Sequence, residues 1–208
     1  MSQLTIKKLN TDEGTNIFPQ IAQGQIAWLR TKVGDNKIML SDGDKITEIS
    51  ENVDSISFPE ISGNNTVWKA IKFDSGIQIF FNNSKQTIQL SDNNFSDRIL
   101  SFDMSEDSVV WCTNHNWNLK LRDRKANSIS NLDFIYGKIY FYNGKKTIVL
   151  NKDYKGAYPA VSENHVVWQG ITSSDSDSDS DSEIFLYDGK KTIQLTSNDA
   201  DDYFPQIS

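Results

Sequence analysis

The feature that most constrains this fold is a short pattern that recurs along the chain: an aromatic residue, a proline and, nine residues after the proline, a tryptophan. It covers Phe18–Trp28, Phe58–Trp68 and Tyr158–Trp168, and Ser101–Trp111 is a weaker copy without the proline. All four prolines (Pro19, Pro59, Pro159, Pro205) hold one position of the pattern, and four of the five tryptophans (Trp28, Trp68, Trp111, Trp168) hold the other. Such self-similarity indicates a repeat architecture.

The second half of each unit also recurs. Glu183–Leu195 matches Lys138–Leu150 closely, while Gln78–Leu90 and Lys37–Ile49 match more loosely. Each copy has two alternating apolar segments around Asp-Gly, Asn-Gly or similar residues, which accept the backbone angles of a tight hairpin turn. A complete unit is therefore four short antiparallel strands, which we call A, B, C and D.

Four-stranded units repeated about every 40 residues bury both faces only by stacking, and radial stacking gives a propeller. The sequence thus predicts an all-β fold, a small β-propeller of four-stranded antiparallel blades. A β-sandwich is the competing architecture, but it would not need near-identical units.

The number of blades depends on one irregular interval. The tryptophan spacings are 40, 43 and 57 residues, and the last is too long for one blade and too short for two. We favour five blades, one of them abbreviated, with units at about 18–57, 58–97, 98–132, 133–157 and 158–203; the alternative is four blades with a long insertion.

Both ends of the chain match parts of a unit. Residues 1–17 contain a match to strand D, and 204–208 match strand A. These terminal half-units leave three alternatives: an unusual ring closure, a homo-oligomer formed by strand exchange, or a segment of a longer array.

The order Pro-x-Ile/Val-Ser, Val-Val-Trp, Ile-Phe-Leu-Tyr-Asp-Gly and Thr-Ile-Gln-Leu-Thr resembles the repeats of TolB-like bacterial propellers, also described as WD40-like or PD40-type repeats. The resemblance covers nearly the whole chain and implies the architecture rather than an activity, because such repeats occur in periplasmic scaffolds and in peptidase gating domains. The Gly-His and Trp-Asp pairs of true WD40 repeats and the Gly-Gly of kelch repeats are missing.

Charge and hydropathy exclude several partners. The formal net charge of -7 and the scattered lysines argue against nucleic acid, which requires a basic stripe. No apolar run is long enough for a membrane span or a signal peptide, so the default expectation is a cytoplasmic protein without membrane contact. Cys112 is the only cysteine, which leaves the redox compartment open.

Few residues stand out as a site. The blade tryptophans are expected in the core, and the B–C loops, where propellers often bind partners, offer Arg30, Lys32, Lys69, Lys72 and Trp117. Asp175, Asp177, Asp179 and Asp181 have an alternation reminiscent of calcium loops, but the run lacks the glycine and closing glutamate and is more typical of a solvated loop.

No catalytic motif or cofactor motif is present, so we expect no enzyme activity and no cofactor, with weak calcium binding as the one exception. The leading hypothesis is a non-enzymatic scaffold that binds a protein. The alternative is a carbohydrate-binding propeller that holds a glycan in pockets between blades.

Overall fold

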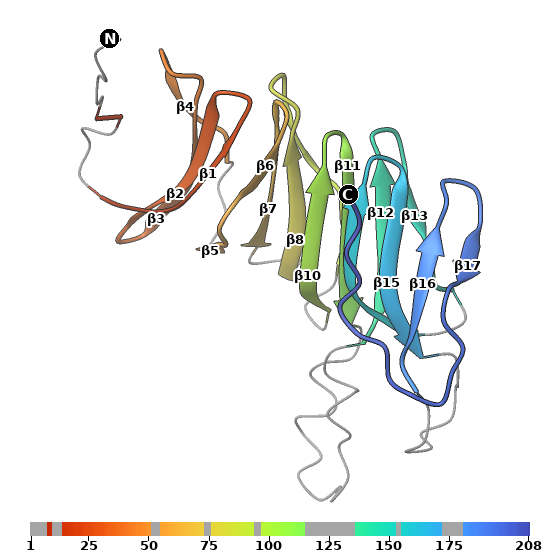
Figure 1. Ribbon diagram of the computed structural model, residues 1–208. Helices are drawn as coiled ribbons and strands as arrows, with labels where there is room; N and C mark the ends of the chain where they lie inside the picture. The colour runs from red at the N-terminus through yellow and green to blue at the C-terminus, as the bar shows by residue number, and fades with distance from the viewer. Residues whose placement is uncertain are drawn as a thin grey trace, which may run out of the picture.

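The structure is a computed structural model that describes residues 8–9, 14–50, 55–72, 76–93, 97–114, 136–152, 155–171 and 181–208. These residues form four separate antiparallel sheets (Figure 1). Each sheet corresponds to one blade, which confirms the all-β propeller-type fold.

Strand order follows chain order in every blade. Blade 1 contains β1 (Thr15–Ala22), β2 (Gln25–Lys32), β3 (Asp35–Ser41) and β4 (Ile46–Glu48). Blade 2 contains β5 (Ser55–Ile56) and β6 (Glu60–Ser62), which together are an interrupted strand A, then β7 (Asn65–Lys72), β8 (Gly76–Asn82) and β9 (Thr87–Gln89). Blade 3 contains β10 (Arg98–Ser105), β11 (Ser108–Asn114), β12 (Lys138–Asn143) and β13 (Thr147–Val149). Blade 4 contains β14 (Lys155–Ser162), β15 (His165–Ile171), β16 (Glu183–Tyr187) and β17 (Thr192–Gln194).

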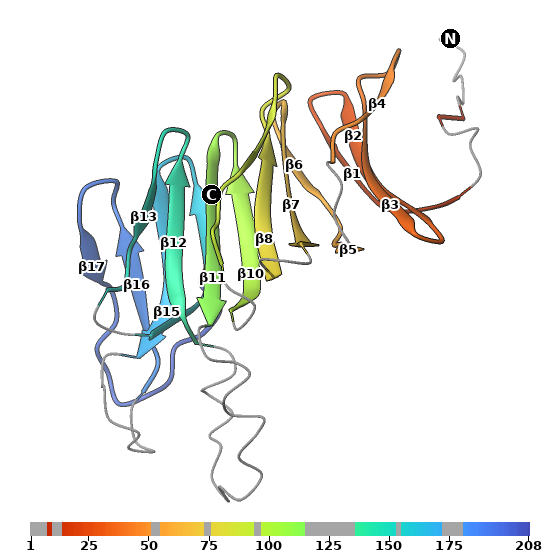
Figure 2. The same ribbon diagram turned by 180° about the vertical axis from the view of Figure 1, so that it is seen from behind.

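The blades stand side by side in chain order and form an open row (Figures 1 and 2). Blade 1 is at one end of the row and blade 4 at the other, so the described sheets do not close into a ring. The A–B and C–D turns lie along one edge of the row, and the B–C connections lie along the opposite edge.

The hairpin between strands C and D has the same chemistry in every blade. Its first residue, Asp42, Asn83, Asn143 or Asp188, accepts two backbone N–H bonds on its side-chain oxygen from the residues two and three positions later. These bonds lower the pKa of Asp42 and of Asp188, because they stabilise the carboxylate. The predicted turn residues therefore fix the hairpins through local Asx turns.

A second repeated bond closes strand D. A polar side chain two residues beyond the strand (Ser50, Ser91, Asn151 or Thr196) accepts the backbone N–H of the isoleucine near the start of strand C. This bond satisfies the backbone N–H of that isoleucine, which the hydrogen bonds between the strands leave unpaired. Each short strand D is therefore fixed by the C–D hairpin before it and by this bond after it.

Three of the four blade tryptophans lie between blades, as expected. Trp68, Trp111 and Trp168 are buried and stack on the aromatic residue opposite them in strand C, with ring centroids 5.9, 5.5 and 5.8 Å apart. Each packs against apolar residues of the preceding blade; Trp168, for example, belongs to one cluster with Val110 and Ile139 of blade 3. The repeated tryptophan is thus the centre of each blade junction.

The favoured division into units 98–132 and 133–157 is wrong. Strand β11 pairs with β12, with Trp111 opposite Tyr140 and Cys112 opposite Ile139, so 98–149 is one blade. The described residues therefore form four blades, the alternative count. The long tryptophan spacing arises because 115–135 separate two strands that pair directly.

Candidate functional site

The four basic residues predicted to project from loops lie in strands instead. Arg30 and Lys32 belong to β2, and Lys69 and Lys72 belong to β7. Strand β2 continues to a turn of only two residues, Val33-Gly34, which places both basic residues inside the sheet.

Arg30 takes part in an ion-pair network on the face of blade 1. Its guanidinium lies 3.4 Å from the Asp35 carboxylate and 3.8 Å from that of Glu48. The Lys37 ammonium lies 3.0 Å from Glu48 and 3.7 Å from Asp35. These four charges balance one another, so the network adds no net charge to the surface.

The two lysines of β7 are also engaged within the fold. The Lys72 ammonium donates to Gln89 Oε1 at 3.0 Å and lies 5.1 Å from the centre of the Phe80 ring. Burial and the nearby Arg98 lower the pKa of Lys69. The structure therefore does not bring the predicted basic residues together into one site.

The structure describes only one of the remaining predicted site residues. Trp117, Asp175, Asp177 and Asp179 lie outside the described residues, whereas Asp181 is described and half-buried. Within the described ranges, no group of three or more acidic, histidine or cysteine side chains is arranged to hold a metal ion. Calcium binding by the acidic run stays a prediction.

Aromatic rings along the A strands form two contacting groups, one in blades 1 to 3 and one that joins blade 4 to the C-terminal residues. Phe18 lies 5.7 Å from Phe58, Phe58 lies 6.2 Å from Phe102, and Tyr158 lies 4.8 Å from Phe204, measured between ring centroids. Phe18, Phe58, Tyr158 and Phe204 are 52%, 43%, 37% and 63% exposed. We call Phe18, Phe58, Phe102, Tyr158 and Phe204 the aromatic column; all except Phe102 are exposed.

A bulge accompanies the aromatic-proline pair in two of the blades. In β1 and β14 the pairing shifts between Ile17 and Gln20 and between Ala157 and Ala160, which marks a bulge at the aromatic-proline pair. Phe18 and Tyr158 have φ angles of 54° and 47°, a left-handed conformation that non-glycine residues seldom adopt. A bulge re-aims a side chain away from the ladder, so the strained backbone turns each ring outward.

The C-terminal residues extend the column. Phe204, also in the left-handed region with φ of 52°, contacts Tyr158 as Phe58 contacts Phe18. Its backbone N–H donates to Gln169 Oε1 of β15 at 3.1 Å. Residues 204–208 therefore lie where strand A of a further blade would begin, and the homo-oligomer through terminal half-units stays a prediction.

Two carboxyl groups lie near the column on the same strands. The Asp103 carboxylate accepts the backbone N–H of Met104 at 2.9 Å and that of Val161, in the next blade, at 2.8 Å. Burial, together with the charge of Asp103, raises the pKa of Glu60 to about 8. Glu60 therefore holds a proton at neutral pH, and Asp103 connects blade 3 to blade 4.

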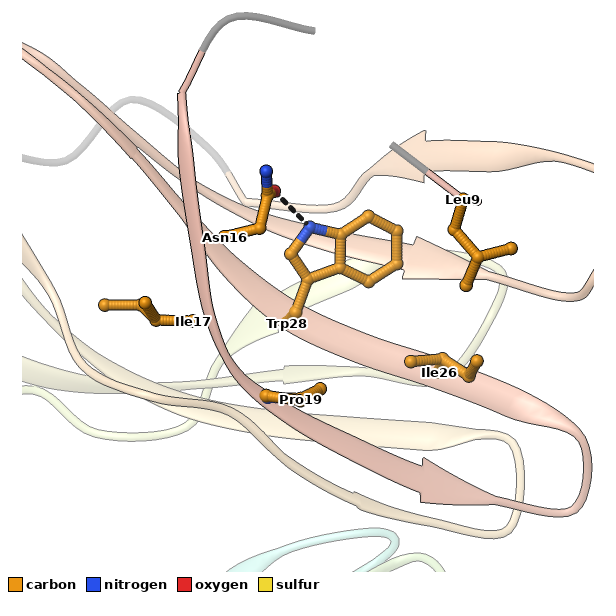
Figure 3. A pocket seen from close by; sticks show the side chains of 6 residues that line it. All are labelled: Leu9, Asn16, Ile17, Pro19, Ile26 and Trp28. Atoms are coloured by element: carbon orange, nitrogen blue, oxygen red, sulfur yellow. Dashed lines mark hydrogen bonds between the residues drawn. The ribbon is translucent and has the colours of Figure 1, made fainter. Parts of the chain in front are cut away.

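An apolar hollow of about 170 Å³ lies on the face of blade 1, at Trp28 (Figure 3). Leu9, Pro19 and Ile26 surround the indole, whose Nε1 donates to Asn16 Oδ1 at 2.7 Å. Met39, rather than an aromatic residue, lies opposite Trp28 in β3. This face corresponds to the one that packs against a preceding blade elsewhere, so the hollow is the open half of a blade junction.

A wider groove of about 440 Å³ lies between blades 1 and 2, beside their C–D hairpins. Polar side chains form much of its wall, including those of Gln25, Lys45 and Lys85. Two lysines are therefore among the residues that line a groove between successive blades.

Neither the aromatic column nor the groove between blades 1 and 2 was predicted from the sequence. The aromatic residue before each proline was visible as part of the repeat, but a repeated aromatic is usually a core residue, and only the bulge explains its exposure. The groove combines residues about 60 positions apart, from Gln25 to Thr87, and no local pattern marks it.

Comparison with solved structures supports the fold. The β-propeller domain of the Trilobed protease from Pyrococcus furiosus superposes with a TM-score of 0.52 at 13% identity, over 86% of this chain and 56% of that one. An uncharacterized protein from Listeria monocytogenes EGD-e gives a TM-score of 0.49 at 12% identity, over 95% of this chain and 58% of that one. The chain thus spans little more than half the length of these two structures.

No family model matches the chain, and no curated protein matches it. The comparisons therefore show a β-propeller type of fold and no particular family. The described part of the chain also contains no helix with the length and apolar character needed to cross a membrane.

Proposed function

We propose that the chain is a non-enzymatic protein-interaction scaffold and that the aromatic column is its binding surface. The observation that carries this proposal is the exposure of Phe18, Phe58, Tyr158 and Phe204, each more than a third exposed, along the A strands of blades 1, 2 and 4 and the C-terminal residues. Aromatic side chains are enriched at the centres of protein interfaces, because they bury a large apolar area at a small cost in side-chain entropy.

The contacts within the column favour an apolar protein surface over a sugar. Within each of its two contacting groups the rings lie at centroid distances of 4.8 to 6.2 Å, so their faces are partly covered and their outer edges are what a ligand would meet. A sugar stacks on a free ring face, whereas apolar side chains of a partner can pack between ring edges.

The alternative function, a lectin with equivalent pockets between blades, receives less support. Residues at the position of Gln25 in the other blades are Asn65, Ser108 and His165, which share neither size nor hydrogen-bonding pattern. Repeated glycan pockets would need similar side chains at such positions.

Site-specific photo-cross-linking tests the scaffold proposal. A benzophenone amino acid at position 58 should capture a discrete protein partner in the native cells, and Phe18→Ser should weaken that capture. The matched control is the same photoreactive residue at Val33. This residue is fully exposed in the turn between β2 and β3 of blade 1 and is not part of the aromatic column. Capture of the same species from both positions, or from neither, would exclude the column as a specific binding surface.

A further inference from the structure

Blade 1 exposes apolar side chains that other blades bury. Ile21 lies opposite the second residue of strand B, as Met104 does in blade 3 and Val161 in blade 4. Met104 and Val161 are 9% and 5% exposed and belong to clusters with the preceding blade, whereas Ile21 is 72% exposed. Ile46, in the same row of the sheet as Ile21, is 39% exposed. With Trp28 they form what we call the blade 1 face, which includes the hollow of Figure 3.

Blade 4 exposes the opposite half of a blade junction. In the junction of blades 3 and 4, Trp168 shares a cluster with Ile139 and Leu150 of blade 3. The matching residues of blade 4 are Ile184 and Leu195, because the Leu195 N–H donates to Ile184 O. The same bond joins Leu150 to Ile139. Leu150 is 8% exposed, whereas Leu195 is 53% exposed. We call Ile184 and Leu195 the blade 4 face.

The two faces are the two halves of one repeated contact. Each described blade junction joins a face of the blade 4 kind to a tryptophan face of the next blade. Blades 1 and 4 are at opposite ends of the row (Figure 1), so one half of each kind lacks a neighbouring sheet within the described part of the chain. A second copy of the chain offers the matching half to each of them. Such a contact joins different surfaces of the two copies, head to tail.

Residues 204–207 show that blade 4 accepts the first strand of blade 1. They have the same sequence as residues 18–21, Phe-Pro-Gln-Ile. The Phe204 ring lies 4.8 Å from the Tyr158 ring, and its backbone N–H donates to Gln169 Oε1. Strand β1 of a second copy can therefore replace 204–208 in this place, with Phe18 against Tyr158, and strands β2 to β4 would then cover the rest of the blade 4 face.

Leu9 has the corresponding place on the blade 1 face. It lies nine residues before Phe18, as Leu195 lies nine residues before Phe204. It lines the hollow at Trp28, and about 170 Å³ remains unfilled beside it. In the contact between copies, Leu195 would take the place of Leu9, and Ile184 would supply the strand C residue that Trp28 lacks.

The charged part of blade 1 is compatible with such a contact. Arg30 forms ion pairs with Asp35 and Glu48 of its own sheet. Covering the neighbouring apolar residues therefore leaves no charge without its partner, which is the costly case in a buried interface.

We propose that the blade 1 face of one copy packs on the blade 4 face of a second copy and forms a further blade junction between them. The partner is a second copy because the chain itself carries both halves of the contact. This contact is separate from the scaffold proposal, since it requires neither Phe58 nor a foreign protein.

Sedimentation velocity of the 208-residue chain over a range of concentrations tests the contact. We expect self-association, and Ile21→Asp and Leu195→Asp should each weaken it at least about tenfold, because each places a charge where an apolar side chain would be buried. Both side chains are exposed, so the melting temperature should not change. Val33→Asp is the matched control: Val33 is fully exposed in the β2–β3 turn, and its replacement should leave association unchanged.

Mixing the two variants tests the head-to-tail geometry. Each variant retains one intact face, so an equimolar mixture of Ile21→Asp and Leu195→Asp should form a complex of one chain of each kind, although neither variant associates strongly alone. A native chain that is monomeric at every concentration, native-like association of Leu195→Asp alone, or a mixture that stays monomeric would each overturn the proposal.

Removal of residues 204–208 separates this contact from strand exchange. These residues occupy the place of β1, so their removal should leave association intact or strengthen it. Loss of association would instead assign it to exchange of this segment and would refute the contact between blade faces. Phe58→Ser should leave association unchanged, because Phe58 belongs to the aromatic column and lies in blade 2, outside both faces.

Discussion

Replacing Glu60 with glutamine should flatten the dependence of stability on pH. In the folded chain, burial and the Asp103 charge raise the pKa of Glu60 from its ordinary 4.5 to about 8. Between these two values the folded state holds a proton that the unfolded state has released. Stability contributed by the protonated carboxyl is therefore complete below pH 4.5 and is lost as the pH rises to 8.

The magnitude follows from the gap between the two pKa values. Each pH unit is worth about 1.4 kcal/mol, so the gap corresponds to an upper limit of roughly 4–5 kcal/mol. Because the side chain is only half-buried, solvent reduces this limit, and we expect Glu60→Gln to be more stable than the native chain by about 2–4 kcal/mol at pH 9. At pH 4 glutamine resembles the protonated acid, so the two chains should be about equally stable.

Urea unfolding followed by tryptophan fluorescence, at pH values from 4 to 9, measures this difference directly. Glu163→Gln is the matched control, because Glu163 is exposed in the β14–β15 turn and its replacement should change stability by no more than about 0.5 kcal/mol at any pH. Parallel stability curves for Glu60→Gln and the native chain, or a less stable Glu60→Gln at pH 9, would refute the reasoning.

Three further predictions concern the blade junctions and hairpins. Burial raises the pKa of the Cys112 thiol to about 12, so a thiol reagent at pH 8 should label it only on unfolding; rapid labelling of the native chain would contradict its buried position. Ser91→Ala should lower stability by about 1–3 kcal/mol in urea unfolding, because Ser91 Oγ accepts Ile79 N–H at 2.8 Å and donates to Gln78 Oε1 at 2.7 Å; no change would mean that these bonds are replaced by water. Gly156→Ala should lower the melting temperature, with a cost of about 1–3 kcal/mol, because a new Cβ would lie 2.7 Å from an Ile139 carbon; an unchanged melting temperature would show that the junction yields.

The hairpins and the core tryptophans could be predicted because their chemistry is local. Asp42 and Asn143 form turns with residues two and three positions away, so a four-residue pattern carries the information. The tryptophan position is marked by repetition, and burial between blades is the physical result of stacking identical units.

The blade count could not be read in the same way. The pairing of Cys112 with Ile139 joins residues on opposite sides of 115–135. A pattern of neighbouring residues cannot predict a contact between residues so far apart in the sequence. Strand-like segments within 115–135 therefore fit the repeat pattern as well as β12 does, although β12 is the strand that pairs with β11.

The predicted loop residues failed for a related reason. Arg30 and Lys32 are charged, and charge near the end of an apolar segment is normally taken as the start of a loop. In blade 1 the strand continues because Arg30 finds its partners on β3 and β4, namely Asp35 and Glu48. Only the sheet brings these charges together, so the sequence alone gave no reason to extend the strand.

Arg30 also distinguishes the end blade from the internal ones. Two residues after the blade tryptophan, the other blades have Ala70, Thr113 and Gly170. At Gly170 a Cβ would lie 2.9 Å from the ring of Phe185, which belongs to strand C of the same blade, so blade 4 itself leaves little space at this position.

In blade 1 the arginine is accommodated within its own sheet. Its side chain is only 17% exposed, and the carboxylates of Asp35 on β3 and Glu48 on β4 neutralise its charge. A basic residue that the sequence placed in a binding loop is therefore explained by ion pairs inside blade 1.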